Sequence, residues 1–158
     1  MSLYTRHNPE GLPSFVTTNT HGRRPILKDP PVADLLVETI YQVRAEVRFL
    51  MLAFTIMPDH VHLILVSPAE RLGLILQLIK GRFARRFNLR SGRSGAVWQS
   101  RYHERTLRSD KALANAIEYV HNNPVVARLV AEPSAYRWSS ANGRFLTDLA
   151  AYFGQAEA

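Results

Sequence analysis

Apolar residues recur along the chain at two spacings, which predicts a mixture of strands and helices. Short runs of β-forming residues predict four strands, at residues 14–18, 48–56, 60–66 and 96–107. Apolar residues that recur every three or four positions predict three helices, at residues 30–44, 71–87 and 110–122. Pro124 is expected to mark the end of the last helix, because proline cannot donate a backbone hydrogen bond.

The order of these elements is β-α-β-β-α-β followed by a third helix. It predicts an α+β fold of the ferredoxin-like, split βαβ type, with a four-stranded antiparallel sheet and helices on one face. The tight turn at Met57-Pro58-Asp59 pairs the strands on either side of it, and strand 60–66 should lie in mid-sheet. We expect the domain to cover residues 1–130, with a C-terminal extension, 131–158, packed on it.

The composition narrows the chemistry open to the chain. With 46% hydrophobic and 21% charged residues, it is typical of a globular protein. No stretch approaches the roughly 18 uninterrupted apolar residues of a membrane span, and the polar N-terminus lacks the apolar core of a secretory signal, so we expect a cytoplasmic protein. The absence of cysteine leaves histidine, carboxylate and amide groups as metal ligands.

The chain is basic, with a net charge of +7 from 20 Lys and Arg against 13 Asp and Glu. Arginine suits bidentate contact with phosphate, which favours nucleic acid as a partner. Six basic residues and no acid lie between Lys80 and Arg93, although a solvated helix face explains such a run equally well. We predict nucleic-acid contacts for seven basic residues: Arg23, Arg24, Lys80, Arg82, Arg85, Arg86 and Arg101.

Two histidines lie close together in the predicted strand 60–66. Side chains alternate between the faces of a strand, so His60 and His62 share one face. About 7 Å apart along the strand, they can hold one metal ion from one side. The pattern is short, and taken alone it fits a polar strand face better than a metal site.

The predicted helix 110–122 carries a second pair of candidate residues. Tyr119 and Asn123 are four residues apart and share one helical face if the helix persists that far. Taken alone, Tyr119 is typical of a partly buried aromatic residue and Asn123 of a helix end. Together with His60 and His62 they fit phosphodiester cleavage. In that reaction tyrosine attacks phosphorus, while an ion on the two imidazoles and the Asn123 amide oxygen polarises the phosphate.

These motifs, in this order, resemble those of the HUH-type single-tyrosine transposases, the family of IS200-like and REP-associated enzymes. His60-Val61-His62 resembles the family's His-hydrophobic-His motif, and Tyr119 with Asn123 and Pro124 resembles its nucleophile helix. The likeness extends from about residue 14 to residue 145. Three further segments resemble the REP-associated branch: Thr20-His21-Gly22-Arg23-Arg24-Pro25, Trp98-Gln99 and Trp138-Ser139-Ser140.

The resemblance implies the same ferredoxin-like fold, with residues 1–130 as the catalytic domain. It also implies that Tyr119 cleaves and rejoins single-stranded DNA at hairpin-flanked sites through a 5′-phosphotyrosine intermediate. The implied cofactor is Mg²⁺ or Mn²⁺, held by His60, His62 and Asn123. Insertion-sequence relatives are typically homodimers with sites completed across the interface, whereas REP-associated relatives include monomers, so the oligomeric state stays open.

The sequence departs from the family pattern at two places. Asp59 stands where asparagine is common, which adds a negative charge beside His60. Val125-Val126-Ala127-Arg128 replaces the usual Val-Arg-Ala-Gly run. Both departures concern local geometry and leave the implied ligand set unchanged.

Two other functions stay open at this point. A non-catalytic module of ferredoxin-like fold would bind hairpin nucleic acid with the usual salt dependence and would be indifferent to metal. A metal-dependent nuclease with water as its nucleophile would need His60 and His62 but not Tyr119. Of the remaining histidines, His121 is expected on the far side of its helix, and His103 is either a surface residue or a DNA contact.

Overall fold

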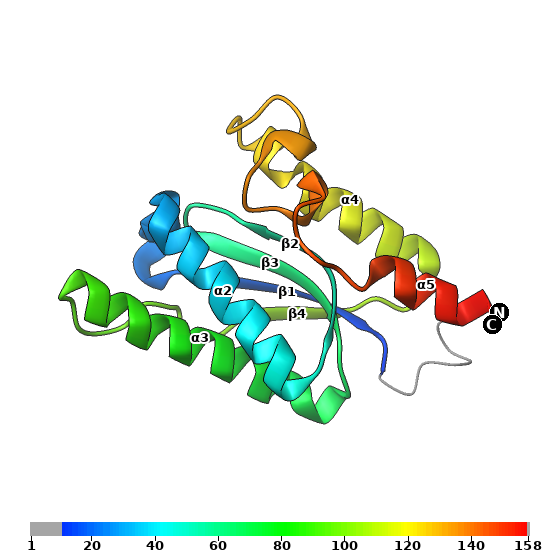
Figure 1. The fold of residues 1–158 in the computed structure, drawn as a ribbon, viewed down its shortest axis with the longest axis horizontal. Coiled ribbons are helices and arrows are strands. Elements are labelled where there is room, and N and C mark those ends of the chain that lie inside the picture. Colours follow the sequence, from blue (N-terminus) through cyan, green and yellow to red (C-terminus); the bar gives the residue numbers. More distant parts are fainter. Residues whose placement is uncertain (1–10, 158) are drawn as a thin grey trace.

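A four-stranded antiparallel sheet forms the centre of the molecule (Figure 1). The computed structural model describes residues 11–157. The order across the sheet is β2-β3-β1-β4, so the histidine-bearing strand β3 lies in mid-sheet as predicted. The strands are β1 (Pro13–Asn19), β2 (Leu50–Ile56), β3 (His60–Val66) and β4 (His103–Thr106).

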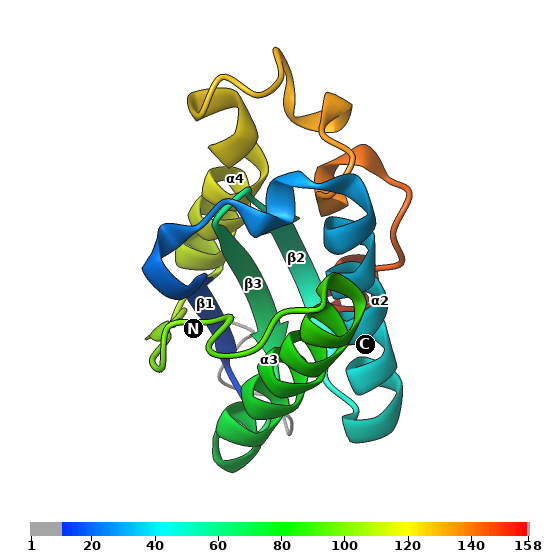
Figure 2. The same cartoon turned by 90° about the vertical axis from the view of Figure 1, so that its left-hand side faces the viewer.

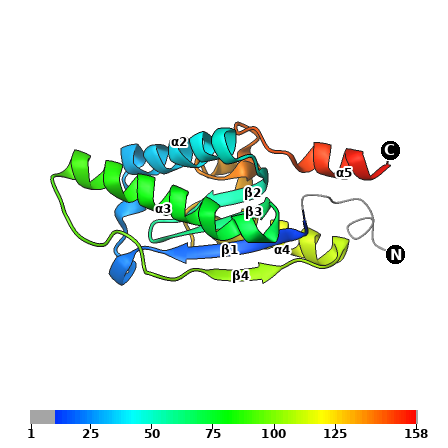
Figure 3. The ribbon, with the colours of Figure 1, turned by 90° about the horizontal axis from the view of Figure 1, so that it is seen from below.

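The helices form a layer on each side of this sheet. Figures 2 and 3 show α2 and α3 together on one face and α4 on the opposite face. This arrangement confirms the predicted α+β, ferredoxin-like fold with an added third helix. The α-helices are α2 (Pro30–Val47), α3 (Ala69–Ser91), α4 (Asp110–Val126) and α5 (Leu149–Glu157). Short 3₁₀ helices lie between them: η1 (His21–Arg23), η2 (Ile26–Lys28), η3 (Pro133–Ala135) and η4 (Ser140–Asn142).

Two apolar cores result, one on each face of the sheet. Strands β2 and β3 are buried along almost their whole length because helices cover both of their faces. The larger core joins α2 and α3 to one face and includes Phe54, Leu63 and Phe83. The smaller core joins α4 to the other face, with Leu113 and Val120 against the sheet. The smaller core therefore sets the height of α4 above β3.

The fourth strand is shorter than the predicted 96–107. Trp98 makes an isolated bridge with Thr20, and its indole ring is buried 5.3 Å from the ring of Phe83. The indole N–H donates to the carbonyl of Lys80 at 3.0 Å. This packing ties the chain to α3, and regular pairing begins only at His103. The tertiary contact of one tryptophan thus overrides the β-forming pattern around it.

All three predicted helices run past their predicted ends, α2 by three residues to Val47. Helix α3 continues to Ser91 and stops at Gly92, whose φ of 66° is the left-handed conformation that favours glycine at a helix end. Helix α4 does not stop before Pro124 but includes it and ends at Val126. Pro124 is buried against the sheet side of the helix, so packing stabilises the last turn despite the missing backbone donor. Asn123 is therefore helical rather than a helix end.

The C-terminal segment packs along the outer edge of the sheet. The amide of Ile56 donates to the carbonyl of Trp138 at 2.9 Å, and the amide of Met51 donates to a carboxylate oxygen of Asp148 at 2.8 Å. These contacts satisfy backbone donors of the edge strand β2 that would otherwise be unpaired. Residues 1–10 of the predicted domain 1–130 lie outside the described residues, as does Ala158. The expectation of a cytoplasmic location rests partly on those first ten residues. Within residues 11–157, no helix is long and apolar enough to cross a membrane.

The buried hydroxyl of Tyr136 gives a test of this edge packing. It donates to the carbonyl of Ile56 at 2.6 Å, so Tyr136→Phe leaves a buried acceptor with one bond fewer. We expect a loss of about 1–2 kcal/mol in the free energy of unfolding, measured by urea denaturation. The control is Tyr102→Phe, because the half-buried Tyr102 makes no hydroxyl hydrogen bond within the described part of the chain. Equal stabilities for the two variants would contradict the assigned role.

Candidate active site

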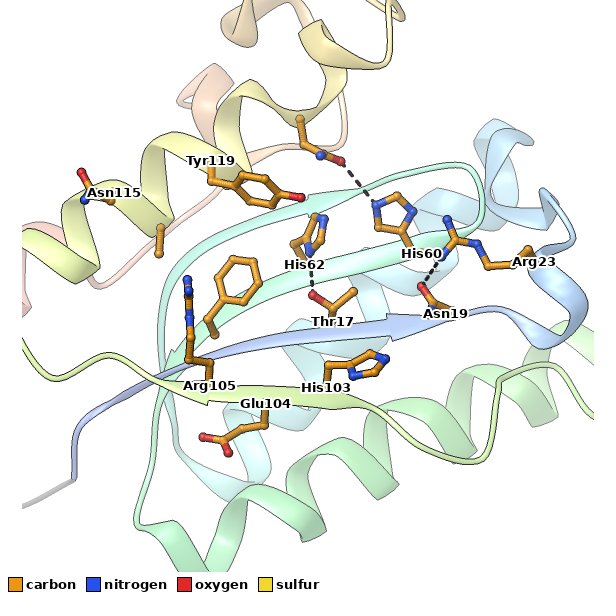
Figure 4. A pocket seen from close by; sticks show the side chains of 13 residues that line it. Thr17, Asn19, Arg23, His60, His62, His103, Glu104, Arg105, Asn115 and Tyr119 are labelled. Atoms are coloured by element: carbon orange, nitrogen blue, oxygen red, sulfur yellow. Dashed lines mark hydrogen bonds between the residues drawn. The ribbon is translucent and has the colours of Figure 1, made fainter.

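The sheet brings polar side chains together on the face that α4 covers. In the antiparallel register between β1 and β3, Thr17 lies opposite His62 and Asn19 lies opposite His60. Alternation along each strand then points all four side chains to the same side (Figure 4). The two imidazole rings are 4.7 Å apart between centroids, so the predicted pairing of His60 and His62 on one strand face is realised.

Helix α4 places its tyrosine over this row. The Ser109 hydroxyl caps the helix by accepting from the amide of Ala112, which fixes where the first turn begins. The apolar side of α4 packs on the sheet, while Tyr119 stays 55% exposed on the adjoining side. The Tyr119 ring lies 5.5 Å from the ring of His62, edge to face, and its hydroxyl points toward the two histidines (Figure 4).

Asn123 completes the cluster from one turn further along α4. Its side-chain oxygen lies 3.3 Å from Nε2 of His60. Because α4 continues past Pro124, Tyr119 and Asn123 share one helix face, as the four-residue spacing predicted. One helix therefore delivers both residues to the two histidines.

Each histidine is oriented through its Nδ1 atom. The Nδ1–H of His60 donates to a carboxylate oxygen of Asp59 at 2.7 Å, and Nδ1 of His62 lies 2.9 Å from the Thr17 hydroxyl. With the proton on Nδ1 in both rings, both Nε2 atoms carry free lone pairs. Nε2 of His62 is buried and has no hydrogen-bond partner within residues 11–157.

These atoms fit a divalent metal ion. Metal-binding histidines commonly hold the ring nitrogen that does not bind the ion in a hydrogen bond to a carboxylate or another acceptor, which is the arrangement at Asp59 and Thr17. Neighbouring ligands of an octahedral Mg²⁺ ion stand about 3 Å apart, because each lies about 2.1 Å from the ion. The 3.3 Å between His60 Nε2 and the Asn123 oxygen is close to that spacing. In the described residues no three His, Asp or Glu side chains form a metal cluster, so the third protein ligand would be this amide oxygen.

The electrostatics of the pair also suit a ligand role. Burial lowers the pKa of His62 to about 4, with smaller contributions from the positive charges of His60 and Arg23. The imidazole is therefore neutral at pH 7, as a metal ligand must be. Burial alone would raise the pKa of Asp59, but the hydrogen bond from His60 and the charge of Arg23 outweigh it and hold that pKa below its usual range.

Arg23, predicted as a DNA contact, lies at the rim of this site. Its Nε donates to Asp59 at 3.0 Å and its Nη1 donates to Asn19 at 2.7 Å. Arg23 itself has a φ of 54°, a left-handed conformation that non-glycine residues rarely adopt. Strain of this kind is tolerated where the surrounding contacts require it, and here they brace the carboxylate that orients His60.

The site opens into a cavity of about 860 Å³ between α4 and the sheet. Several of its lining residues were not singled out in the sequence, because only the strand register places them there. They come from β1 and β4: Phe15, Thr17, Asn19, Glu104 and Arg105. His103 lines the same cavity, while His121 is directed away and contacts the Ser140 hydroxyl at 2.7 Å. If β1 had been predicted to pair with both β3 and β4, the alternation of side chains along these strands would have placed most of these residues on the same face as the histidines.

The other basic residues predicted to contact nucleic acid lie outside the cavity. Four of them, Lys80, Arg82, Arg85 and Arg86, belong to α3 on the opposite face of the sheet. Three of these four are engaged within the protein: Lys80 with the carbonyl of Gln99, Arg82 with Glu46 and Arg86 with the Thr39 hydroxyl. Burial also lowers the pKa of Lys80.

Three of the seven predicted nucleic-acid contacts, Arg24, Arg85 and Arg101, remain to be placed. Arg24 donates to the carbonyls of His21 and Ala96, and Arg85 and Arg101 are exposed. DNA contact by any of these residues stays a prediction, and the α3 residues could contribute only on a surface distinct from the cavity.

Comparison with known proteins identifies the class. The model of the family described as IS200-like transposases matches residues 15–123, a stretch that contains Tyr119, Asn123 and both histidines. The fold, the site and this match together define a transposase, and hence a DNA-processing enzyme. The chain belongs to the IS200-like transposase family.

Individual relatives agree with this assignment. The chain is 27% identical over 142 residues to a REP-associated tyrosine transposase of Escherichia coli, an alignment that covers 89% of this chain and 82% of the relative. It is 32% identical over 88 residues to a provisionally assigned REP-associated tyrosine transposase of Haemophilus influenzae, covering 49% of this chain and only half of the relative. A solved structure of a REP-associated tyrosine transposase bound to a REP hairpin has the same fold, with a TM-score of 0.72, 24% identity and coverage of 94% of this chain and 93% of that one.

The buried imidazole predicts a pH dependence. The unfolded chain binds a proton at His62 near pH 6.5, whereas the folded metal-free protein does so only near pH 4. Stability from the neutral imidazole is therefore fully present above about pH 6.5 and is lost as the pH falls toward 4. NMR titration of the metal-free protein should show His62 neutral at pH 5.5, and His62→Asn should flatten the fall in stability over this range. A midpoint for His62 near 6.5 would contradict the prediction.

Proposed function

We propose that this transposase cleaves and rejoins single-stranded DNA at hairpin-flanked sites through a covalent 5′-phosphotyrosine intermediate. The observation that carries the proposal is the placement of the exposed Tyr119 ring 5.5 Å from His62, whose Nε2 has no partner within residues 11–157, while Nε2 of His60 lies 3.3 Å from the Asn123 oxygen. Hairpin DNA as the substrate is supported by the solved relative, which is bound to a REP hairpin.

The hydroxyl of Tyr119 is the nucleophile in this proposal. Its oxygen attacks phosphorus, a new P–O bond to tyrosine forms, and the bond from phosphorus to the 3′ oxygen of the preceding nucleotide breaks. The phenol proton leaves to solvent, and the departing 3′ oxygen takes up a proton to become a free hydroxyl. A 3′ hydroxyl can later attack the phosphotyrosine, which restores a phosphodiester and the tyrosine without an external energy source.

We further propose that His60, His62 and Asn123 bind Mg²⁺ or Mn²⁺. A bound ion would withdraw charge from the non-bridging oxygens of the scissile phosphate. The protein contributes the orientation of its ligands: Asp59 and Thr17 hold the two rings through their Nδ1 atoms, which leaves both Nε2 atoms for the ion. The rigid central strand and the packed helix limit the movement of these groups, which favours in-line attack.

The residues proposed for the site lie together within one chain. Tyr119, Asn123 and both histidines approach one another without a second copy, since the Tyr119 and His62 rings are already in contact distance. We therefore propose that cleavage needs only a monomer, and that any homodimer would not have to exchange α4 between subunits.

The first test captures the covalent intermediate. A pool of single-stranded oligonucleotides, each with a hairpin whose loop and flanks are randomised, is incubated with the protein and Mn²⁺. The protein is then denatured, and the DNA that stays covalently attached to it is sequenced. The selected oligonucleotide should form an adduct with the wild-type chain. Tyr119→Phe should form none while it binds the same DNA within a few-fold, because only the attacking oxygen is lost.

Other outcomes of the same experiment would indicate one of the two alternative functions, the binding module or the water-dependent nuclease. Metal-independent, salt-sensitive binding with no cleavage by the wild-type chain would indicate the binding module instead. Multiple-turnover cleavage that survives Tyr119→Phe would indicate a nuclease that uses water. A control at Tyr102, Tyr102→Phe, should leave adduct formation intact.

The second test concerns the carboxylate that orients His60. Asp59→Ala removes the acceptor of the Nδ1 hydrogen bond, and we expect Mn²⁺ affinity to fall roughly 10- to 100-fold, as for other groups that orient metal ligands. Asp59→Asn keeps an acceptor and should lose less. Calorimetric titration with Mn²⁺ measures both without reference to activity. Glu46→Ala, which breaks an ion pair on the opposite face, is the matched control. Unchanged affinity in Asp59→Ala would show that the carboxylate does not serve the metal.

A further inference from the structure

Strand β4, at the edge of the sheet opposite β2, lines one side of the cavity. In the register with β1, Arg105 lies opposite Phe15 and His103 lies opposite Thr17. Arg105 and His103 are two residues apart and thus share the face on which the site is built. Both line the same cavity as Tyr119.

Arg105 reaches from β4 toward α4 across the ring of Phe15. Its guanidinium carbon lies 5.5 Å from the centre of that ring, and the Phe15 ring lies 5.9 Å from the ring of Tyr119. Figure 4 shows Arg105 pointing from β4 toward α4 on one side of Tyr119, with His60 on the other side. The Phe15 ring is therefore a neighbour of both Tyr119 and a cation in the same cavity.

The guanidinium of Arg105 has no carboxylate partner within the described part of the chain. The ion pairs there engage Arg23, Arg44, Arg82 and Arg137, each with an acid at 2.6–3.0 Å. Glu104 is adjacent in sequence and also lines the cavity, but its carboxylate accepts from the Thr106 hydroxyl and points away from Arg105 (Figure 4). Arg105 thus presents an unneutralised, exposed fork of N–H donors to the cavity, which is the geometry that recognises phosphate.

We propose that Arg105 binds a second phosphate of the DNA strand, next to the one that Tyr119 attacks. The proposal rests on the function proposed above, and it adds a phosphate subsite on β4 at the opposite end of the cavity from the metal ligands. The half-buried Phe15 ring beside Arg105 lines the cavity and gives the intervening nucleotide an apolar neighbour. A contact to this neighbouring phosphate, together with the contacts to the scissile phosphate, holds the strand in line with the tyrosine oxygen.

The experiment combines protein variants with neutral phosphates. In the selected oligonucleotide, a methylphosphonate replaces one phosphate at a time on either side of the cleavage position, which removes one charge per molecule. Adduct formation with Mn²⁺ and affinity are measured for the wild-type chain, Arg105→Ala and Arg105→Lys. Arg90→Ala is the matched control, because Arg90 is an exposed arginine on the opposite helical layer.

We expect Arg105→Ala to lower affinity and the rate of adduct formation about 10- to 100-fold, because a charged hydrogen bond is lost. One methylphosphonate position should weaken the wild-type reaction by a similar factor and have no further effect on Arg105→Ala. That position identifies whether the phosphate lies on the 5′ or the 3′ side. Arg105→Lys should recover part of the loss, since it keeps the charge without the fork.

Three results would overturn the proposal. If Arg105→Ala behaves like Arg90→Ala, the subsite does not exist. If Arg105→Ala is equally sensitive at every position and its thermal stability falls, the arginine only covers Phe15. If the wild-type chain forms no adduct with any DNA, the proposed function fails and the subsite with it, and this failure is visible in the same assay before any variant is compared.

Discussion

The packing of α4 on the sheet is the contact on which the candidate site depends. Leu113, Ala116, Val120 and Pro124 form the buried side of this helix, and they fix both its height above β3 and its rotation. Rotation decides the chemistry, because the side of α4 next to the apolar stripe carries Tyr119 and Asn123. A shift of one position along the helix would turn these side chains by about 100° away from the histidines. The arrangement of the candidate site is thus a consequence of ordinary apolar burial.

Strand β3 carries a polar group that apolar burial does not favour. It is covered on both faces, yet it carries His62, whose Nε2 atom is buried without a partner in residues 11–157. A buried polar atom left unpaired costs about 1–3 kcal/mol, so such a side chain marks a place where function outweighs stability. The Thr17 hydroxyl limits the cost by holding the other ring nitrogen, and it also keeps the ring aimed at the cavity.

The arginines divide according to what they face. Arg82 and Arg86 on α3 are bonded to groups of α2 and join the two helices of the larger layer. Arg23 and Arg105 instead lie at opposite ends of the cavity, one bracing Asp59 and the other exposed beside Phe15. Net charge therefore describes the partner in general terms, whereas position relative to the cavity separates arginines that maintain the fold from those that can meet DNA.

The sequence by itself determined three features, because strand alternation and helical periodicity are local properties. These are the order of elements, the shared face of His60 and His62, and the one-turn spacing of Tyr119 and Asn123. The face that α4 covers, the continuation of α4 through Pro124 and the short β4 were decided by tertiary packing. So were the surroundings of Thr17 and Arg105. Strand register places Thr17 beside His62, 45 residues away in the sequence, and places Arg105 beside Phe15. Local patterns predict which groups share a surface, but contacts between distant segments decide which surfaces meet.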